Sequence, residues 1–389
     1  MPARPLVLHV TADYPDPVRE PTTRAVKQLI DGLTGLDHVV VSLKRQHDPR
    51  RFYTVDCGRP DGYRLFAHGY PGLPLGVGLF ASFFRVARVI RRLLAANDLR
   101  PDLVFAHRLS FDGIAGWLLA RHYGVPLVVS VRGEVETKIF RFKPTYRPLL
   151  KRIAGDAARI YAVSAWFRPA LIRMTGVDPA RIRPLPNVVA NTKATIVPRA
   201  PSRGLVSVLN LDIWRKKGLD RLIEAMAVVG GRHPDLTLDV IGGGSEAARA
   251  AIAAHIRRHG VGERVRLVGA LDNAALIERL PDYLAMVLPS HNETFGMVYT
   301  EALFAGVPIG YSRGTGIDGH LDGLEVGVGI DPGSVGAIVA AIERLIGDNG
   351  GYRATIAAKG AELAERFDPA RLFAMVEADI RAAIATGRG

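Results

Sequence analysis

The sequence predicts an α/β protein with two parallel sheets, each covered by helices on both faces. Short apolar runs rich in β-branched residues alternate with helical patterns along the chain, as in Leu6–Ala12 followed by Ala25–Leu33. Such alternation is typical of βαβ units, whose strands pair in parallel. It stops once, over Pro184–Pro201, where four prolines and the lack of a sustained period indicate a linker. At 389 residues, the chain is long enough for one domain on each side.

The first half contains six apolar runs of strand length, and Gly and Pro punctuate the helical stretches between them. The expected strands are Leu6–Ala12, Val39–Leu43, Tyr63–His68, Leu103–His107, Leu127–Val131 and Ile160–Ser164. The expected helices are Ala25–Leu33, Gly78–Ala96 and Gly113–Tyr123.

The alternation restarts after the linker. The expected strands there are Leu205–Leu209, Leu236–Ile241, Val265–Val268, Leu284–Leu288 and Ile309–Tyr311. The expected helices are Asp220–Val229, Glu246–Arg258, Phe295–Ala305 and a terminal helix, Pro369–Ala385.

One stretch, Pro289–Pro308, suits a phosphate-bearing sugar ligand. It follows an apolar strand, and its helix begins near Phe295 and ends at Gly306-Val307-Pro308. The loop carries Glu293 and the helix carries Glu301, so carboxylates that accept hydrogen bonds from hydroxyls flank the helix start. Helix N-termini bind anions through unpaired N–H groups and the helix dipole. Those N–H groups belong to Thr294, Phe295, Gly296 and Met297. The alternative is a capped helix with two surface carboxylates.

Glu293 and Glu301, with Phe295-Gly296 between them and Gly306 and Pro308 after them, resemble the E-x7-E signature of glycosyltransferase family 4. This is a large family of retaining glycosyltransferases with the GT-B fold. The resemblance implies two Rossmann-like α/β domains whose parallel sheets face a central cleft.

The same resemblance sets the expected domain boundaries. Residues 1–190 are expected to form an acceptor-binding domain, 191–203 a linker, and 204–368 a nucleotide-sugar-binding domain. Family members return their last helix to the first domain. For residues 369–389, two arrangements are open: the helix returns to the first domain, or it stays on its own domain.

The resemblance also implies roles at the donor. Lys217, before Gly218, matches the family's lysine at the donor diphosphate, where a cation balances charge on the leaving group. Glu293 is expected to orient the sugar hydroxyls and Glu301 to hold the ribose. Asn210 stands where the family usually has an Arg, and Arg215 or Lys216 can substitute. The other expected donor contacts are Gly243, Gly269, Leu271 and the Thr294, Phe295, Gly296 and Met297 amides.

On the acceptor side, His107 and Arg132 end two neighbouring expected strands. The family commonly has His-Gly at the second of these places, and Arg132-Gly133 departs from that pattern. The family's glycine-rich loop is also altered, because Asp13–Arg24 contains no Gly pair. His107 and Arg132 are nevertheless expected catalytic residues, with a structural role for His107 as the alternative.

These features together predict an enzyme. We expect a retaining hexosyltransferase that moves a sugar from a UDP- or GDP-linked donor to a glycan or lipid-linked saccharide, in polysaccharide or glycolipid biosynthesis. No Asp-x-Asp triad occurs, so neither a metal nor a cofactor is expected. The alternatives are a soluble-acceptor transferase, a phosphorylase of the same fold, and a catalytically silent protein that binds a sugar nucleotide or a polyanion.

The net charge of +13 indicates an anionic partner, which can be nucleic acid, an anionic membrane or small phosphate-bearing ligands. The alternative is a soluble protein that is simply rich in arginine. We expect no nucleic acid, since no zinc-ligand cluster, aromatic RNP-like strand or helix-turn-helix signature is present. Two basic tracts instead suit an anionic membrane: the arginine side of helix Leu79–Ala95, and Lys138–Arg152, whose interleaved aromatics follow no clean period. For the helix, the alternative is a solvated face.

The expected location is cytoplasmic and peripheral on the inner face of the plasma membrane. Cys57 is the only cysteine, so no internal disulfide forms and a reducing compartment is expected. The N-terminus lacks a signal-peptide pattern, and no apolar run reaches the roughly 18 residues of a spanning helix.

Overall fold

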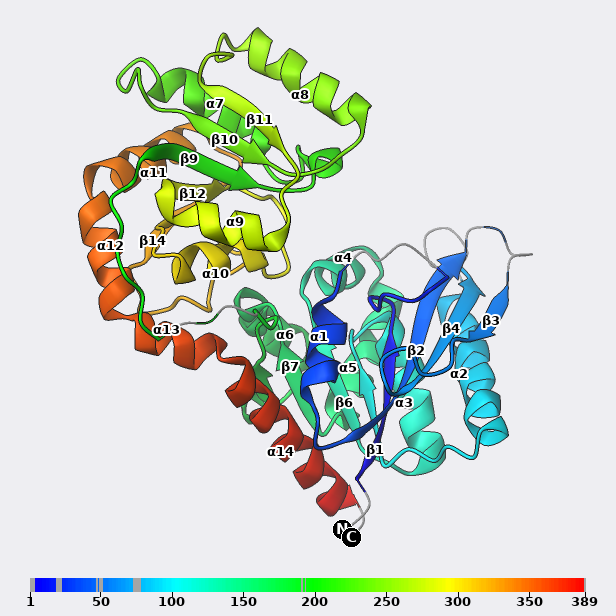
Figure 1. Ribbon diagram of the computed structural model, residues 1–389. Coiled ribbons are helices and arrows are strands. Elements are labelled where there is room, and N and C mark those ends of the chain that lie inside the picture. The colour runs from blue at the N-terminus through cyan, green and yellow to red at the C-terminus, as the bar shows by residue number, and fades with distance from the viewer. Residues whose placement is uncertain are drawn as a thin grey trace. The chain divides into compact units, whose positions relative to one another are not determined.

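The chain folds into two compact α/β units (Figure 1). The computed structural model describes residues 4–18, 23–46, 48, 52–72, 78–189, 192 and 194–387. The first unit consists of Met1–Val163, Phe167–Val188 and Pro369–Gly389, and the second of Ser164–Trp166 and Val189–Asp368.

The first unit is built on an eight-stranded sheet with the order β3-β4-β2-β1-β5-β6-β7-β8. Every neighbouring pair is parallel except β3 and β4, which are antiparallel. The strands are β1 (Leu6–Thr11), β2 (Asp37–Gln46), β3 (Tyr53–Asp56), β4 (Arg64–Pro71), β5 (Leu103–Ala106), β6 (Leu127–Val131), β7 (Arg159–Ala162) and β8 (Ile182–Pro184).

Seven helices belong to the described part of this unit. They are α1 (Ala25–Gly32), α2 (Leu79–Ala96), α3 (Phe111–Tyr123), α4 (Glu134–Phe142), α5 (Arg147–Asp156), α6 (Arg168–Thr175) and α14 (Pro369–Gly387). The terminal helix packs on this sheet: Leu372, Val376 and Ile380 are buried in one cluster with Val7 and Phe105. Polar contacts fix it as well, because Glu377 accepts a hydrogen bond from the Gly35 amide at 2.8 Å.

The second unit has a six-stranded, wholly parallel sheet with the order β11-β10-β9-β12-β13-β14. The strands are β9 (Arg203–Val208), β10 (Leu238–Ile241), β11 (Val265–Gly269), β12 (Tyr283–Leu288), β13 (Ile309–Ser312) and β14 (Gly327–Ile330). The described helices are α7 (Leu219–Val229), α8 (Glu246–Arg258), α9 (Asn273–Arg279), α10 (Met297–Phe304), α11 (Val335–Gly347), α12 (Asn349–Ala358) and α13 (Gly360–Phe367).

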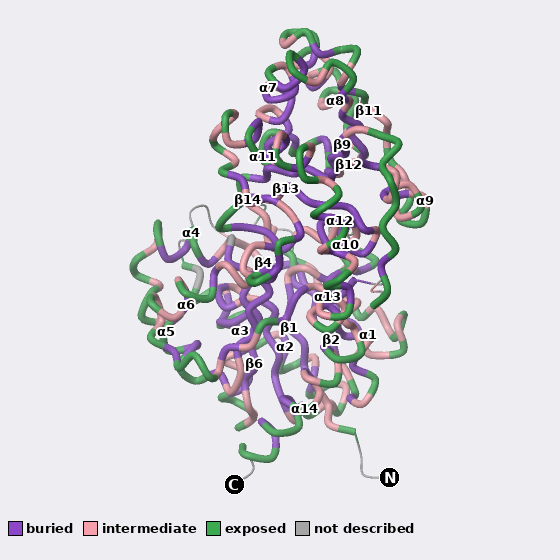
Figure 2. Tube along the Cα trace, turned by 90° about the vertical axis from the view of Figure 1, so that its left-hand side faces the viewer, coloured by how far each residue is buried: buried purple, intermediate pink, exposed green. Residues whose placement is uncertain are grey.

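Buried residues follow the strands of both sheets (Figure 2). In β5, β6 and β10 every residue is buried, as expected for central parallel strands covered on both faces. Burying a single large apolar side chain stabilises the fold by about 1.5–3 kcal/mol, so these strands anchor each unit.

The strand order reverses once in each sheet. In the first unit the reversal falls between β1 and β5, and in the second between β9 and β12. Ligands of open α/β sheets bind beyond the carboxyl ends of strands at such a switch point. The loops after β1, β5, β9 and β12 are therefore where a site is expected, and they hold most of the predicted site residues.

All of the expected strands and helices are confirmed to within a few residues at their ends. The structure also contains elements that were not predicted from the sequence: β3, β8, β14, α4–α6, α9 and α11–α13. β3 is a largely exposed edge strand, and β14 reads Gly-Val-Gly-Ile, so neither has a strong strand pattern.

Two surface interpretations were wrong. Lys138–Arg152 is not aperiodic: it forms α4 and α5, and the Pro144–Tyr146 turn between them breaks the period. In α2, Phe80 was assigned to the apolar side but is 42% exposed, whereas Phe83, Val86 and Ile90 are buried. Within the described residues, no helix combines the length and apolarity needed to cross a bilayer.

Candidate active site

The loop after β9 positions Lys217. Asn210 caps the turn Leu211–Ile213 by accepting the Asp212 amide at 2.8 Å, and the chain then reaches Gly218 before α7. Gly218 has φ +71°, and a Cβ there would lie 1.9 Å from the carbonyl oxygen of Pro289. Only glycine therefore lets this loop pack against the loop after β12.

We expect Gly218→Ala to destabilise the second unit by more than the ~1–2 kcal/mol cost of a left-handed alanine, because the clash with Pro289 adds to it. Hydrogen exchange of β9 and β12 amides measures the effect. Gly262→Ala is the control, since a Cβ there meets nothing within 4 Å. Equal protection in the two variants would contradict the close approach.

The two loops bring a cation and a carboxylate together. The His291 amide donates to the Lys216 carbonyl at 3.0 Å, which aligns the loops. Lys217 Nζ and Glu293 Oε2 form an ion pair, and the two side chains are 17% and 14% exposed. Thr315 fixes Glu293 from behind, accepting from its amide at 2.7 Å and donating to its carbonyl at 2.8 Å. Lys217 and Glu293, both predicted site residues, are thus paired at the switch point of the second unit.

The start of α10 lies beside this pair. Gly296 has φ +77°, and a Cβ there would lie 3.3 Å from Cγ of Glu293. The helix begins at Met297 rather than near Phe295, which corrects the expected boundary. Phe295 is fully buried against His320 and Phe367, with ring centroids 5.3 and 6.0 Å away, so only its backbone can contact a ligand. Thr294, Gly296 and Met297 are partly exposed.

Glu301 lies one turn further along α10. Its Oε1 accepts a hydrogen bond from the Asn273 side-chain amide at 3.1 Å, which links α10 to the start of α9. Burial raises the pKa of Glu301, and the bond from Asn273 opposes that rise. A half-buried carboxylate with capacity to accept further bonds is suited to holding hydroxyls.

The remaining loops that are predicted to contact the donor are joined by backbone hydrogen bonds. The Leu211 amide donates to Gly243 at 2.9 Å, and the Gly242 amide donates to Gly269 at 2.9 Å. Gly269, Ala270 and Leu271 lead from β11 to α9, where Leu271 is partly buried. The turn at Gly243 and the turn at Gly269, both predicted to contact the donor, are therefore adjacent.

Arg215 and Lys216 are the two candidates for a second cation beside Lys217, and Arg215 has a defined environment. Its guanidinium lies 4.1 Å above the Trp214 ring in a cation–π contact, and the side chain is exposed. Lys216 is exposed as well. Asn210, at the family's Arg position, serves the backbone of its own turn.

In the first unit, charged side chains gather at the other switch point. Asp13, after β1, pairs with Arg108, after β5, through Nη2–Oδ1 at 2.5 Å and Nε–Oδ2 at 3.1 Å. Arg132 Nε lies 3.8 Å from the same Asp13 carboxylate. Burial lowers the pKa of Arg132, and the negative charge of Asp13 opposes this. Arg132 is thus a positioned cation, 11% exposed, at the end of β6.

His107 belongs to a row of three histidines. His38 Nε2 lies 2.9 Å from the Leu33 carbonyl, His38 Nδ1 lies 3.1 Å from His9 Nε2, and His9 Nδ1 lies 3.0 Å from His107 Nε2. A carbonyl only accepts, so in neutral rings each Nε2 carries the proton and donates along the row. His107 Nδ1 then presents a lone pair, and this atom has no hydrogen-bond partner among the described residues.

This lone pair belongs to a ring that is 1% exposed. Burial, with repulsion from Arg132, lowers the pKa of His107 to about 3, so the ring is a weak base at neutral pH. His107 and Arg132 line one small cavity of about 10 Å³ together with Ser130 and Asn187. The structure thus brings the two expected acceptor-side residues together, in a unit separate from Lys217 and Glu293.

Sequence reasoning missed four residues that hold these groups in place: Thr315, Asn273, Asp13 and Arg108. Asp13 and Arg108 each follow a strand at its carboxyl end, which is a signal that could have identified them. Thr315 and Asn273 are distant in sequence from the glutamates that they contact, and no local pattern marks them.

Comparison with known proteins settles the family. The family described as "Glycosyl transferases group 1" matches residues 205–363, and the "Glycosyl transferase 4-like domain" matches residues 22–188. The chain is a group 1 glycosyl transferase. The expected resemblance is confirmed, and so is the assignment as a glycosyltransferase enzyme.

Relatives match along the whole chain. Glycogen synthase of Mycobacterium tuberculosis (strain ATCC 25618 / H37Rv) is 26% identical over 385 residues, covering 93% of this chain and 91% of the relative. Sucrose-phosphate synthase from Thermosynechococcus elongatus has a TM-score of 0.73 at 21% identity, covering 99% of this chain and all of that one. HepE of Anabaena, solved in complex with UDP, has a TM-score of 0.69 at 18% identity, covering 98% and 100%. This group 1 glycosyl transferase therefore has the expected GT-B fold.

Proposed function

We propose that this group 1 glycosyl transferase moves a sugar from a UDP- or GDP-linked donor to a hydroxyl of a glycan or lipid-linked saccharide, with retention and without a metal. The observation that carries the proposal is the Lys217–Glu293 ion pair beside the start of α10, at the switch point of the second unit. The similarity to HepE, whose crystal structure contains UDP, supports a nucleotide-linked donor.

In this proposal Lys217 and the Gly296 and Met297 amides bind the donor diphosphate. The first N–H groups of a helix have no partner within it, so they are available to phosphate oxygens. Lys217 turns from Glu293 to the diphosphate, which leaves the Glu293 carboxylate to accept sugar hydroxyls. Glu301, oriented by Asn273, accepts the ribose hydroxyls.

The chemical step requires positioning more than side-chain proton transfer. The bond between C1 and the diphosphate oxygen breaks, and the acceptor oxygen bonds to C1 on the same face. The acceptor proton passes to the departing phosphate oxygen. Lys217 stabilises the charge that grows there. His107, a weak base, offers the lone pair of Nδ1 as a hydrogen-bond acceptor in the cavity that it shares with Arg132.

A donor panel tests the proposal. The full chain is incubated with UDP- and GDP-sugars and oligosaccharide or lipid-linked acceptors, and release of nucleoside diphosphate is measured with and without EDTA. We expect turnover that EDTA leaves unchanged and an α-linked product from an α-linked donor by NMR. Binding without turnover would favour the silent sugar-nucleotide-binding alternative. Dependence on free phosphate would favour a phosphorylase.

We also propose that the enzyme is peripheral on an anionic membrane surface. One side of α2 exposes Phe80 and Phe84, which are 42% and 55% exposed. The exposed arginines of the same helix are Arg85, Arg88, Arg91 and Arg92. A helix with exposed aromatics among cations suits the headgroup region of a bilayer.

A hollow beside this helix strengthens the proposal. It has a volume of about 780 Å³, lies between α2 and α3, and is lined by Arg88, Arg91, Arg92, Arg100 and His122 among others. Asp98 is the acidic residue in its lining. Its residues precede β5 and β6, so it lies at the opposite end of those strands from His107. Such a basic hollow accommodates a lipid phosphate.

Flotation on liposomes tests this surface. Each cation near an anionic bilayer contributes about 1 kcal/mol, so R88E/R91E should weaken binding to phosphatidylglycerol vesicles by ~10–100-fold. R257E/R258E on α8, with the same change in charge, is the control. Equal flotation on neutral and anionic vesicles, or equal loss in both variants, would remove the membrane proposal and leave glycosyl transfer untouched.

A further inference from the structure

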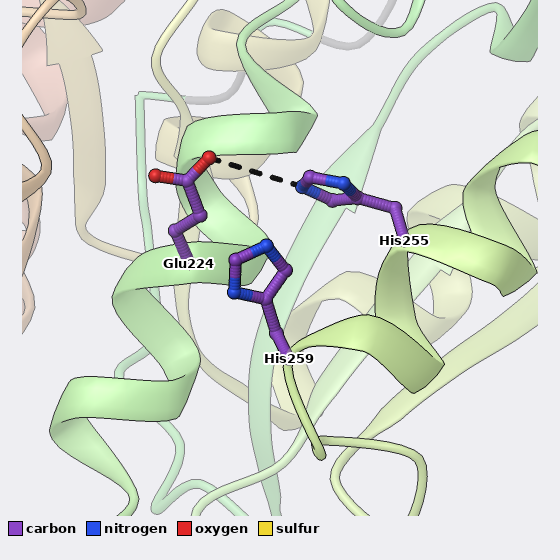
Figure 3. Close-up of side chains that lie close together, drawn as sticks. All are labelled: Glu224, His255 and His259. Atoms are coloured by element: carbon purple, nitrogen blue, oxygen red, sulfur yellow. Dashed lines mark ion pairs between the residues drawn. The ribbon is translucent and has the colours of Figure 1, made fainter.

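Three potential metal ligands converge where the end of α8 packs against α7. Glu224 projects from α7, and His255 and His259 project from the end of α8 toward it (Figure 3). One ligand atom from each residue lies within 4.8 Å of the others. We propose that these residues bind a divalent transition metal of the Zn²⁺ class, which is a site independent of the proposed donor chemistry.

The spacing of the residues suits such a site. His255 and His259 are four positions apart, so they share one face of the helix end, and Glu224 faces them from the neighbouring helix. Two imidazoles and one carboxylate are ligands that Zn²⁺ accepts, and a fourth position stays open to water. Hard ions such as Mg²⁺ and Ca²⁺ prefer oxygen ligands, and two nitrogens select against them.

The ligand atoms are close to the required separation. Glu224 Oε1 lies 3.9 Å from His255 Nε2. In a tetrahedral site with bonds of about 2.0–2.1 Å, ligand atoms lie ~3.4 Å apart, so side-chain rotations must bring this pair closer by about 0.5 Å. The ligand atoms of all three residues lie within 4.8 Å of one another, so no pair has to approach by more than about 1.4 Å.

The surroundings orient the ligands before any metal binds. Arg221 Nη1 donates to Oε2 of Glu224 at 3.2 Å, which leaves Oε1 directed at His255. The His255 ring packs on Trp214 with centroids 5.4 Å apart, and the His259 ring lies 4.6 Å from it. Outer contacts of this kind fix ligand orientation and raise metal affinity.

One contact has to change when the metal binds. His255 Nε2 lies 3.3 Å from the Asp220 carbonyl, so in the neutral ring this nitrogen carries the proton. A ligating Nε2 needs a lone pair, and the ring proton then moves to Nδ1. Metal binding also requires both imidazoles to be neutral.

The site connects two helices that begin at donor loops. α7 starts directly after Lys217-Gly218, and α8 starts after the Gly242–Ser245 turn. A metal between them stabilises the second unit by mass action, because the unfolded chain does not hold the three ligands together. The role that follows is structural and does not involve the reacting sugar.

The test uses the full chain without a polyhistidine tag, with ZnCl₂ and CoCl₂ as probes. We expect Zn²⁺ to raise the melting temperature, Co²⁺ to give visible d–d bands of a four-coordinate site, and Mg²⁺ to do neither. His259→Gln and Glu224→Gln should each weaken Zn²⁺ binding by ~10–100-fold, as loss of a metal contact does. Circular dichroism checks that both variants fold.

Two control variants distinguish binding at this site from nonspecific metal binding elsewhere on the protein. Glu246→Gln alters an exposed carboxylate on α8, and His122→Gln an exposed histidine of the first unit. Both should bind Zn²⁺ as the parent does. The proposal is overturned if the parent gives no Co²⁺ bands, or if the His259 variant binds Zn²⁺ as tightly as the His122 variant.

Discussion

Lys217→Ala should lower kcat for glycosyl transfer by about 10²–10³-fold, which corresponds to ~3–4 kcal/mol of lost transition-state stabilisation. Lys217 is held at the start of α10 by its pair with Glu293, and both side chains are mostly shielded from water. A charge contact in such a place is stronger than one at the surface. Steady-state release of nucleoside diphosphate measures the effect.

The matched control is Lys359→Ala, which breaks another lysine–glutamate pair of the same unit. Lys359 Nζ lies 3.0 Å from Glu362, with side chains 47% and 36% exposed. A solvent-exposed ion pair contributes little to stability, so turnover should stay within about twofold of the parent. If a folded Lys217→Ala variant behaves like this control, the assignment of the diphosphate site is wrong.

Glu293→Gln distinguishes the role of Glu293 from that of its ion-pair partner Lys217. The substitution keeps the shape of the side chain but removes its charge, so Lys217 no longer has to leave a carboxylate to reach the diphosphate. We therefore expect kcat to fall while affinity for the free nucleoside diphosphate holds or improves. Calorimetry on the variant measures that affinity. If Glu293→Gln weakens binding of the nucleoside diphosphate as much as Lys217→Ala does, the division of roles is contradicted.

The sequence predicted the alternation of strands and helices because buried parallel strands and amphipathic helices leave local patterns. It also indicated the Lys217–Gly218 loop and the Glu293–Glu301 spacing, which are local as well. It could not indicate that Thr315 holds Glu293 or that Asn273 holds Glu301, since those contacts join segments more than 20 residues apart.

The misplaced start of α10 has a different cause. Phe295 fits the helical pattern because it is apolar and lies next to the helix, yet Gly296 adopts a left-handed conformation that no helix interior contains. Hydrophobic periodicity records which residues are buried and does not record backbone conformation. The same limit concealed the histidine row, in which His9 lies on β1, His38 lies on β2 and His107 directly follows β5. The three residues look unrelated in sequence.

That row makes the first unit sensitive to acid. Burial lowers the pKa of His9, His38 and His107, and it also lowers that of His68 on β4. Around His38 the carboxylates of Asp37, Glu377 and Asp31 oppose the shift. Around His107 the positive charge of Arg132 adds to it and Asp13 opposes it. Each ring is therefore neutral in the folded unit at pH values where the unfolded chain is protonated.

The sign follows from proton linkage. As pH falls below about 6.5, the unfolded chain takes up protons on these histidines before the folded unit does. The stability that the neutral histidines contribute is therefore full above pH 6.5 and is lost progressively below it, for His107 down to a pH of about 3. Burial raises the pKa of Asp112 to about 7 and also raises that of Glu136, and these two groups act in the opposite direction. The four histidines outnumber the two carboxyls, so we expect the first unit to lose stability as the pH falls.

Hydrogen exchange of β1 and β5 amides between pH 7 and pH 5 measures this loss, after correction for the intrinsic exchange rate. His107→Phe should reduce the slope by about one proton, since phenylalanine can keep the stacking on Phe105, whose ring lies 4.4 Å from that of His107. His122→Gln, at an exposed histidine, should leave the slope unchanged. An NMR titration of His107 with an inflection near pH 6.5 would show that the row takes up protons freely, and the acid sensitivity would then need another source.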